Sequence, residues 1–217
     1  MKLSIFQPWS EFVMKGTLPK ELLSNMIELT DIITQDNEKQ SKNDDLAGEI
    51  EEEWAIDVPL LANVKFLPFV FQLIEEYIRL ARIQSKPIGT SEECTDEEFI
   101  KNESLFWEKR KIKEVWFNNQ KDNEYNPIHS HGGIFSGVLY LKIPNYLPAR
   151  KDNNSDGAIG FIGSTSPNDG LLTSSQFSIL PKVGDIFIFP STLRHLVYPF
   201  RTENGQEIRR SMSFNIS

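Results

Sequence analysis

The stretch YNPIHSHGGIFSGVLYL, residues 125–141, contains two of the three histidines of the chain, His129 and His131. It continues with two glycines and an apolar run typical of a strand. In an extended segment the side chains alternate between two faces, so histidines two residues apart point to the same side. Imidazoles placed in this way can bind one metal ion. Gly132 and Gly133 let the chain turn directly afterwards and leave room beside such an ion.

The third histidine, His195, opens the segment HLVYP after the turn residues PSTL. An antiparallel sheet could bring it opposite His129 and His131. The three would then form a ligand set with open positions, which suits a first-row metal that does chemistry. A histidine pair with one intervening residue also arises by chance, so ordinary surface or core histidines are the alternative. All three histidines fall in strand-like segments, which favours the metal site.

From Lys113 onward, short runs rich in β-branched and aromatic residues are separated by glycine, proline, asparagine and aspartate. The runs are EVWFN, GVLYLKI, GAIGFIG, FSIL, DIFIF, HLVYPF and IRRSMSFNI. Because no long helix lies between them, they predict an antiparallel sandwich or barrel. Upstream, apolar residues at helical spacing predict one helix after Pro19 and another over residues 67–83.

We therefore expect one α+β domain over residues 1–217. Its N-terminal part, 1–111, is expected to be mainly helical, and its C-terminal part, 112–217, to be the β-rich core. The acidic stretch 36–54 is predicted to be a surface loop that could include a short helix. Residues 86–99, KPIGTSEECTDEEF, are predicted to be a connector.

The net charge of −8 argues against a nucleic acid or an anionic membrane as partner. A short basic cluster at Lys109, Arg110, Lys111 and Lys113 is better explained as a solvated face. No stretch approaches the ~20 apolar residues that span a bilayer. The single cysteine, Cys94, permits no intramolecular disulfide, which fits a reducing compartment. We expect a soluble, cytoplasmic protein of open oligomeric state, with a homodimer as one option.

The last predicted strand, in IRRSMSFNIS, has two different faces. Arg209, Ser211, Ser213 and Asn215 share one face, which is polar and could line a cavity. The other face carries Arg210 and then apolar residues that could pack beneath helices. A guanidinium matches a carboxylate in shape and charge. Arg209 is therefore the candidate for binding a carboxylate, with Arg210 as the alternative.

These segments together resemble the iron(II)- and 2-oxoglutarate-dependent dioxygenases, in particular the prolyl-4-hydroxylase-like branch and a family common in phages and marine bacteria. The matching pieces are VWFNNQKDNEYNPIHSHGGIFSGVLYLKIP, GAIGFIG, GDIFIFPSTLRHLVYPF and RRSMSFN, which cover the chain from about Glu114 to its end. The resemblance implies a double-stranded β-helix, a cupin-like jelly-roll, with the N-terminal helices packed on one sheet. It implies iron(II) ligands at His129, His131 and His195.

The same resemblance implies that Arg209 binds the far carboxylate of the cosubstrate 2-oxoglutarate, with Ser211 and Tyr140 as helpers. Asn118 and Asn126 are expected to line the site, with ordinary sheet and turn roles as the alternative. The implied reaction uses dioxygen to hydroxylate a small-molecule or peptidyl substrate, such as peptidyl or free proline, and converts 2-oxoglutarate to succinate. Two alternatives remain: a cupin-like three-histidine dioxygenase without 2-oxoglutarate, and a non-enzymatic β-sandwich binding module.

One position departs from the wider superfamily, in which the second ligand is aspartate or glutamate. Here His131 stands at that position. Three neutral imidazoles leave the ion more positive by a full charge than two imidazoles and a carboxylate, which alters its redox potential and its hold on anions. If His131 does not bind the ion, a carboxylate could come from Asp122, Asp156 or Asp185, although Asp185 lies in a predicted turn.

Overall fold

A computed structural model describes most of the chain. The residues that it describes are 12–43, 48–85, 111–148, 155–163 and 175–217. The predicted connector, the single cysteine and two residues of the basic cluster, Lys109 and Arg110, lie outside these residues.

The larger of two sheets has six antiparallel strands in the order β1-β8-β5-β10-β3-β2. In that order the strands are β1 (Met14–Thr17), β8 (Asp185–Pro190), β5 (Phe135–Lys142), β10 (Arg209–Ile216), β3 (Ile112–Gln120) and β2 (Glu53–Ala55). The central strand β10 pairs with β5 on one side and β3 on the other. Its side chains therefore reach the middle of both faces of the sheet.

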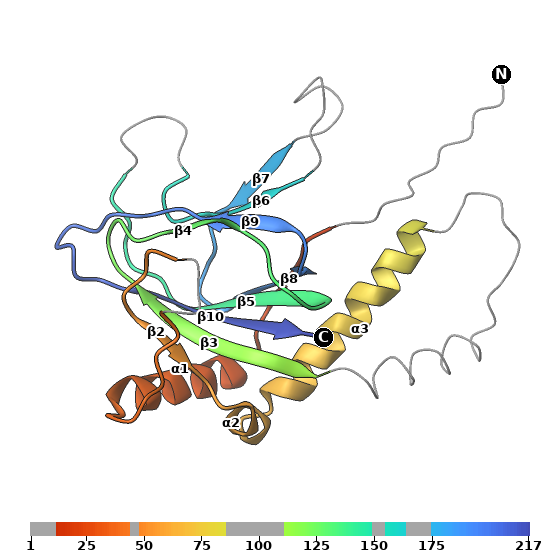
Figure 1. Ribbon diagram of the computed structural model, residues 1–217, viewed down its shortest axis with the longest axis horizontal. Coiled ribbons are helices and arrows are strands. Elements are labelled where there is room, and N and C mark those ends of the chain that lie inside the picture. Colours follow the sequence, from red (N-terminus) through yellow and green to blue (C-terminus); the bar gives the residue numbers. More distant parts are fainter. Residues whose placement is uncertain (1–11, 44–47, 86–110, 149–154, 164–174) are drawn as a thin grey trace, which may run out of the picture.

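The smaller sheet has four strands in the order β4-β9-β6-β7. They are β4 (Asn126–His129), β9 (Arg194–Val197), β6 (Ile159–Ile162) and β7 (Gln176–Ile179). This sheet lies over one face of the larger sheet (Figure 1). The two sheets form the antiparallel sandwich that the short apolar runs predict.

Helices cover the other face of the larger sheet (Figure 1). They are α1 (Lys20–Gln35), α2 (Val58–Asn63) and α3 (Phe66–Ser85). Helix α1 begins directly after Pro19, and its buried Leu22 and Met26 pack in one core with Met212 and Phe214 of β10. The prediction of N-terminal helices on one sheet is confirmed. Within the part of the chain described, none of the helices is both long and apolar enough to cross a membrane.

The N-terminal part also supplies strands that the sequence did not reveal. β1 and β2 form the two edges of the larger sheet. Each has at most four residues, too few for an alternating pattern to show. β2 lies at the end of the acidic stretch 36–54, where Glu53 pairs with Asn118 and is buried. That pairing with β3 removes part of the stretch from the predicted surface loop.

Candidate active site

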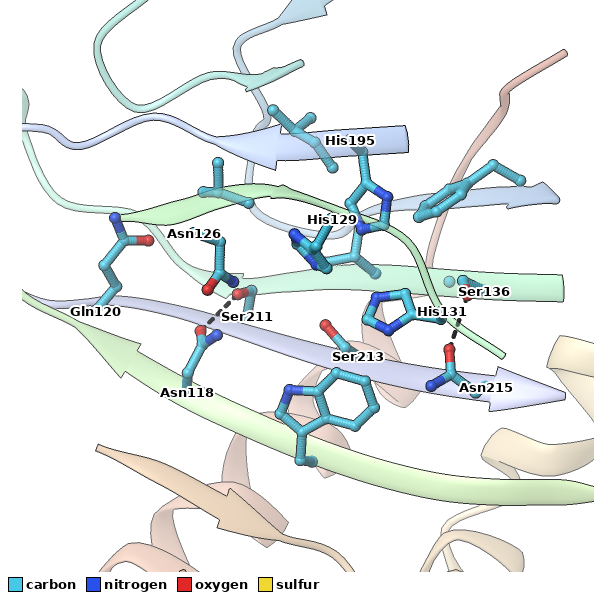
Figure 2. Close-up of a pocket in the computed structure, with 16 residues that line it drawn as sticks. Asn118, Gln120, Asn126, His129, His131, Ser136, His195, Ser211, Ser213 and Asn215 are labelled. Atoms are coloured by element: carbon cyan, nitrogen blue, oxygen red, sulfur yellow. Dashed lines mark hydrogen bonds between the residues drawn. The ribbon is translucent and has the colours of Figure 1, made fainter. Parts of the chain in front are cut away.

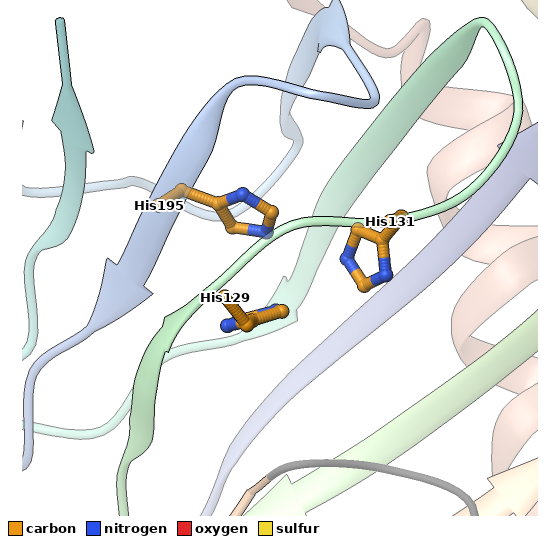
Figure 3. A group of neighbouring side chains, drawn as sticks. All are labelled: His129, His131 and His195. Atoms are coloured by element: carbon orange, nitrogen blue, oxygen red, sulfur yellow. The ribbon is translucent and has the colours of Figure 1, made fainter.

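The three histidines meet between the two sheets (Figure 3). His129 ends β4 and lies directly opposite His195 on β9, and His131 follows two residues later. One ligand atom from each side chain lies within 4.8 Å of the others. Gly133 has a φ of +107°, and a Cβ there would lie 2.6 Å from the Ile216 carbonyl oxygen, so the turn that follows needs glycine. The structure thus brings together all three predicted ligands.

The imidazoles are held in the neutral form that binds metals. Burial lowers the pKa of His129, and burial with the neighbouring His129 lowers the pKa of His131 to about 4 and of His195 to about 3. Nδ1 of His129 lies 2.7 Å from the Pro127 carbonyl oxygen, and Nδ1 of His195 lies 3.0 Å from that of Leu193. Because a carbonyl only accepts, each Nδ1–H is the donor. The Nε2 lone pairs of His129 and His195 remain available for an ion.

The carboxylates named as alternatives to His131 have other partners. Asp122 accepts hydrogen bonds from the backbone and hydroxyl of Thr202, both at 2.8 Å. Asp185 lies 2.8 Å from the Lys15 ammonium, and Asp156 pairs with an arginine. The metal-binding group found among the described residues consists of histidines alone.

The histidines line a pocket together with residues of both sheets (Figure 2). Its polar lining comes largely from β3 and β10, and consists of Asn118, Gln120, Ser211, Ser213 and Asn215, together with Asn126 and Ser136. The Ser211 hydroxyl donates to Asn118 Oδ1 at 2.7 Å, and the Ser136 hydroxyl donates to Asn215 Oδ1 at 2.7 Å. The face of β10 predicted to be polar therefore forms a wall of this pocket.

Arg209 is the next residue on that face and is fully buried. It lies beyond the pocket lining and donates to the Gly157 carbonyl and to Gln120 Oε1. Its Nε has no hydrogen-bond partner, and neither does the buried hydroxyl of Tyr140. The guanidinium carbon lies 5.9 Å from the centre of the Tyr140 ring. Two residues from the predicted cosubstrate site thus lie together with unused donors.

Sequence reasoning missed two residues of this cluster. The buried hydroxyl of Tyr146 also has no hydrogen-bond partner, and Arg209 acts against the rise in its pKa that burial causes. Tyr146 lies in the loop after β5, where no periodic pattern points to it. Gln120 lies two residues beyond the end of the predicted run EVWFN, and because β3 continues to it, it shares a face with Asn118.

Arg210 points to the opposite side of the sheet. Its guanidinium donates to four side chains, those of Asn119, Thr30, Asp31 and Thr34. Three of these belong to helix α1. Arg210 therefore fastens the helix to the sheet, and Arg209 is the arginine on the pocket side.

Comparisons with known proteins place this architecture in a family. Residues 114–215 match the family model described as "Putative 2OG-Fe(II) oxygenase". A prolyl-4-hydroxylase from Pseudomonas putida has a similar structure, with 16% identity and a TM-score of 0.53, over 94% of this chain and 91% of that one. A viral collagen prolyl hydroxylase from Paramecium bursaria Chlorella virus-1, in a 2-oxoglutarate complex, has 13% identity and a TM-score of 0.50, over 95% and 96%. A search of curated proteins finds no match.

Residues 114–215 belong to the 2-oxoglutarate/iron(II) oxygenase family. The fold is a double-stranded β-helix, as predicted. The protein is a 2-oxoglutarate-dependent oxygenase, and its cofactors are iron(II) and 2-oxoglutarate. Dioxygen and an organic substrate are its further reactants. The phage or marine origin and the cytoplasmic location stay predictions.

Proposed function

We propose that the protein is a hydroxylase in which His129, His131 and His195 hold one iron(II) and Arg209 holds the far carboxylate of 2-oxoglutarate. One observation carries the proposal. Three neutral imidazoles converge on one point, and a buried arginine with an unused Nε lies beyond the same pocket. His131 then takes the position at which most relatives in the superfamily have a carboxylate.

The donors around Arg209 fit a carboxylate. A carboxylate offers about four acceptor sites, and the unpaired groups here are Arg209 Nε and the hydroxyls of Tyr140 and Tyr146. Burial raises the pKa of Tyr140 to about 12, so its hydroxyl keeps its proton and remains a donor. Binding would give partners to groups that are costly to bury without them.

When bound, iron and 2-oxoglutarate activate dioxygen and supply the oxidant for hydroxylation. The chain contributes geometry and shelter. The three histidines would hold the ion, and a set of three protein ligands would leave positions open for cosubstrate and dioxygen. The Trp116 ring lies 5.7 Å from the His131 ring, and the Phe189 ring 4.8 Å from the His195 ring, between centroids. These aromatic side chains cover part of the imidazole rings.

For the substrate we propose a peptidyl or free amino acid, such as proline. Two of the similar solved structures are prolyl hydroxylases, which supports this class. Apart from the histidines, the pocket offers amides and hydroxyls from residues such as Asn126 and Ser213, and no charged side chain of the described residues lines it. Such a lining suits a neutral polar group, for example a peptide bond.

An anaerobic titration with iron(II) and then 2-oxoglutarate tests the proposal. We expect one iron per chain and a weak metal-to-ligand charge-transfer band for the wild type. His195→Ala should lose both because it removes a ligand, whereas Phe177→Ala, an exposed change on β7, should keep both. A wild type that shows no band at saturating cosubstrate would refute the assignment, and normal iron binding by His195→Ala would remove that residue from the site.

A further inference from the structure

A buried carboxylate from outside the family match borders the site. Glu53 on β2 is 1% exposed and lies directly opposite Asn118 of β3, so it is on the pocket side of the sheet. Neither of its carboxylate oxygens has a hydrogen-bond partner within the described part of the chain. Unpaired buried polar atoms are rare in native proteins, so a function is the explanation to test first.

Glu53 is one end of a row of three polar side chains. Asn118 pairs with Glu53 on one side and with Ser211 on the other. The Ser211 hydroxyl donates its proton to Asn118 Oδ1 at 2.7 Å (Figure 2). Because this oxygen faces Ser211, the Asn118 side chain can offer only its amide nitrogen to Glu53, and it favours the charged form of that carboxylate. Ser211 therefore presents only lone pairs to the pocket.

An anion at Ser211 requires the opposite direction. If Ser211 donates to a bound carboxylate, it must accept from Asn118, whose amide then turns its nitrogen toward Ser211 and its oxygen toward Glu53. Two facing oxygens repel each other unless Glu53 carries a proton and donates it. A second negative charge nearby favours the same protonation.

We propose that Glu53 is a positioning residue that acts through Asn118 and Ser211, and that 2-oxoglutarate binding at Ser211 is accompanied by uptake of one proton by Glu53. A proton from solvent joins a carboxylate oxygen, and no other covalent bond changes. The inference rests on the proposed function, in which the cosubstrate carboxylate lies at this end of the pocket.

The surroundings of Glu53 make this proton uptake inexpensive at neutral pH. Burial raises its pKa to about 7, the Asn118 side chain acts against the rise, and the Glu124 carboxylate adds to it. The nearest cations have other partners. Lys121 pairs with Glu51 and Glu52 on the opposite face of the strands, at 3.3 and 3.0 Å. Arg209 is held by Gln120 and the Gly157 carbonyl.

The pH dependence of 2-oxoglutarate binding tests the inference. With iron(II) under anaerobic conditions, we expect the wild-type dissociation constant to rise by up to about tenfold per pH unit above neutral pH. Glu53→Gln has the shape of the neutral acid and a fixed donor, so its affinity should stay high and constant. Glu52→Gln, one residue away on the other face, should follow the wild type.

Infrared difference spectra give a readout independent of turnover. Adding 2-oxoglutarate should produce the C=O band of a protonated carboxylic acid in the wild type and in Glu52→Gln, but not in Glu53→Gln. If Glu53→Gln does not fold, the wild-type band alone decides, because its absence overturns the inference. Binding that is independent of pH in the wild type also overturns it and leaves the proposed function standing. Failure to bind 2-oxoglutarate at any pH refutes the proposed function itself.

Discussion

Arg209 and Arg210 are neighbours on β10 and are both buried, yet their surroundings differ. On the helix side, Arg210 donates to four side chains and lies 2.6 Å from the Asp31 carboxylate. On the pocket side, Arg209 keeps an unused Nε beside tyrosine hydroxyls that have no partner. On the outer face of the larger sheet, the buried arginine finds its hydrogen-bond partners within the protein. On the inner face, buried polar groups lack such partners, and in the proposed function a ligand supplies them.

The same contrast recurs at the edge strand β2. Glu52 accepts from Asn119 at 3.0 Å and pairs with Lys121, whereas the adjacent Glu53 has no hydrogen-bond partner. Among the residues described, Trp54 is the only unpaired buried side chain outside the pocket side of the sheet and the Arg209 cluster. Buried polar groups without a hydrogen-bond partner therefore lie mainly on the pocket side of the larger sheet and around Arg209.

Arg209→Ala should give the largest effect. We expect the dissociation constant for 2-oxoglutarate to rise several hundredfold, because removing one partner of a buried, hydrogen-bonded charge pair costs about 4 kcal/mol. Iron binding should persist, since the histidines are untouched. Anaerobic titrations measure both quantities. An unchanged cosubstrate affinity would assign the carboxylate to another residue and break the contrast between the two arginines.

Arg210→Ala should change stability and not binding. The helix loses a guanidinium shared by several side chains, and breaking a buried pair of this kind costs about 3 kcal/mol of unfolding free energy. Asp31 retains Lys142 as a partner, which limits the loss. Urea unfolding measures the change, with cosubstrate affinity of the folded fraction as the control. Normal stability with lost affinity would exchange the roles of the two arginines.

Glu53 and Glu52 should make the free energy of unfolding depend on pH in opposite directions, with smaller effects than those of the arginine variants. The pKa of Glu53 rises from about 4.5 to about 7 on folding. The native state keeps this proton where the unfolded chain releases it, so stability falls as pH rises through that interval. The change is at most about 3 kcal/mol. Glu53→Gln should abolish this fall and be the more stable protein above pH 7.

Glu52 supplies the matched comparison. Burial acts to raise its pKa, but hydrogen bonds from Asn119 and Lys121 outweigh burial and lower it. The stabilisation of the folded state by ionised Glu52 is therefore present at neutral pH. It disappears as the pH falls through the pKa of Glu52 in the folded state. Glu52→Gln should lose stability at pH 7 in urea unfolding. If both variants shift in the same direction, the two faces of β2 do not differ as described.

The β-rich core was predictable because its strands carry their own pattern. Alternation along β10 separated Arg209 from Arg210 without a structure, and the spacing of His129 and His131 placed both on one side. The contribution of the N-terminal part was not predictable. Glu53 is buried only through pairing with a strand far along the chain, and its local sequence, EIEEEW, is typical of a solvated surface.

The two ends of the proposed site belong to different sheets. His129 and His195 are on the smaller sheet, and Arg209 is on the larger one. At the proposed site, iron alone would link two strands that are already paired, whereas a molecule bound to both the iron and Arg209 would link the two sheets and stabilise the folded sandwich by mass action. Succinate, the expected product, is one carbon shorter and lacks the keto group, so it would not make the same link. The connection between the sheets would then weaken when the product has to leave.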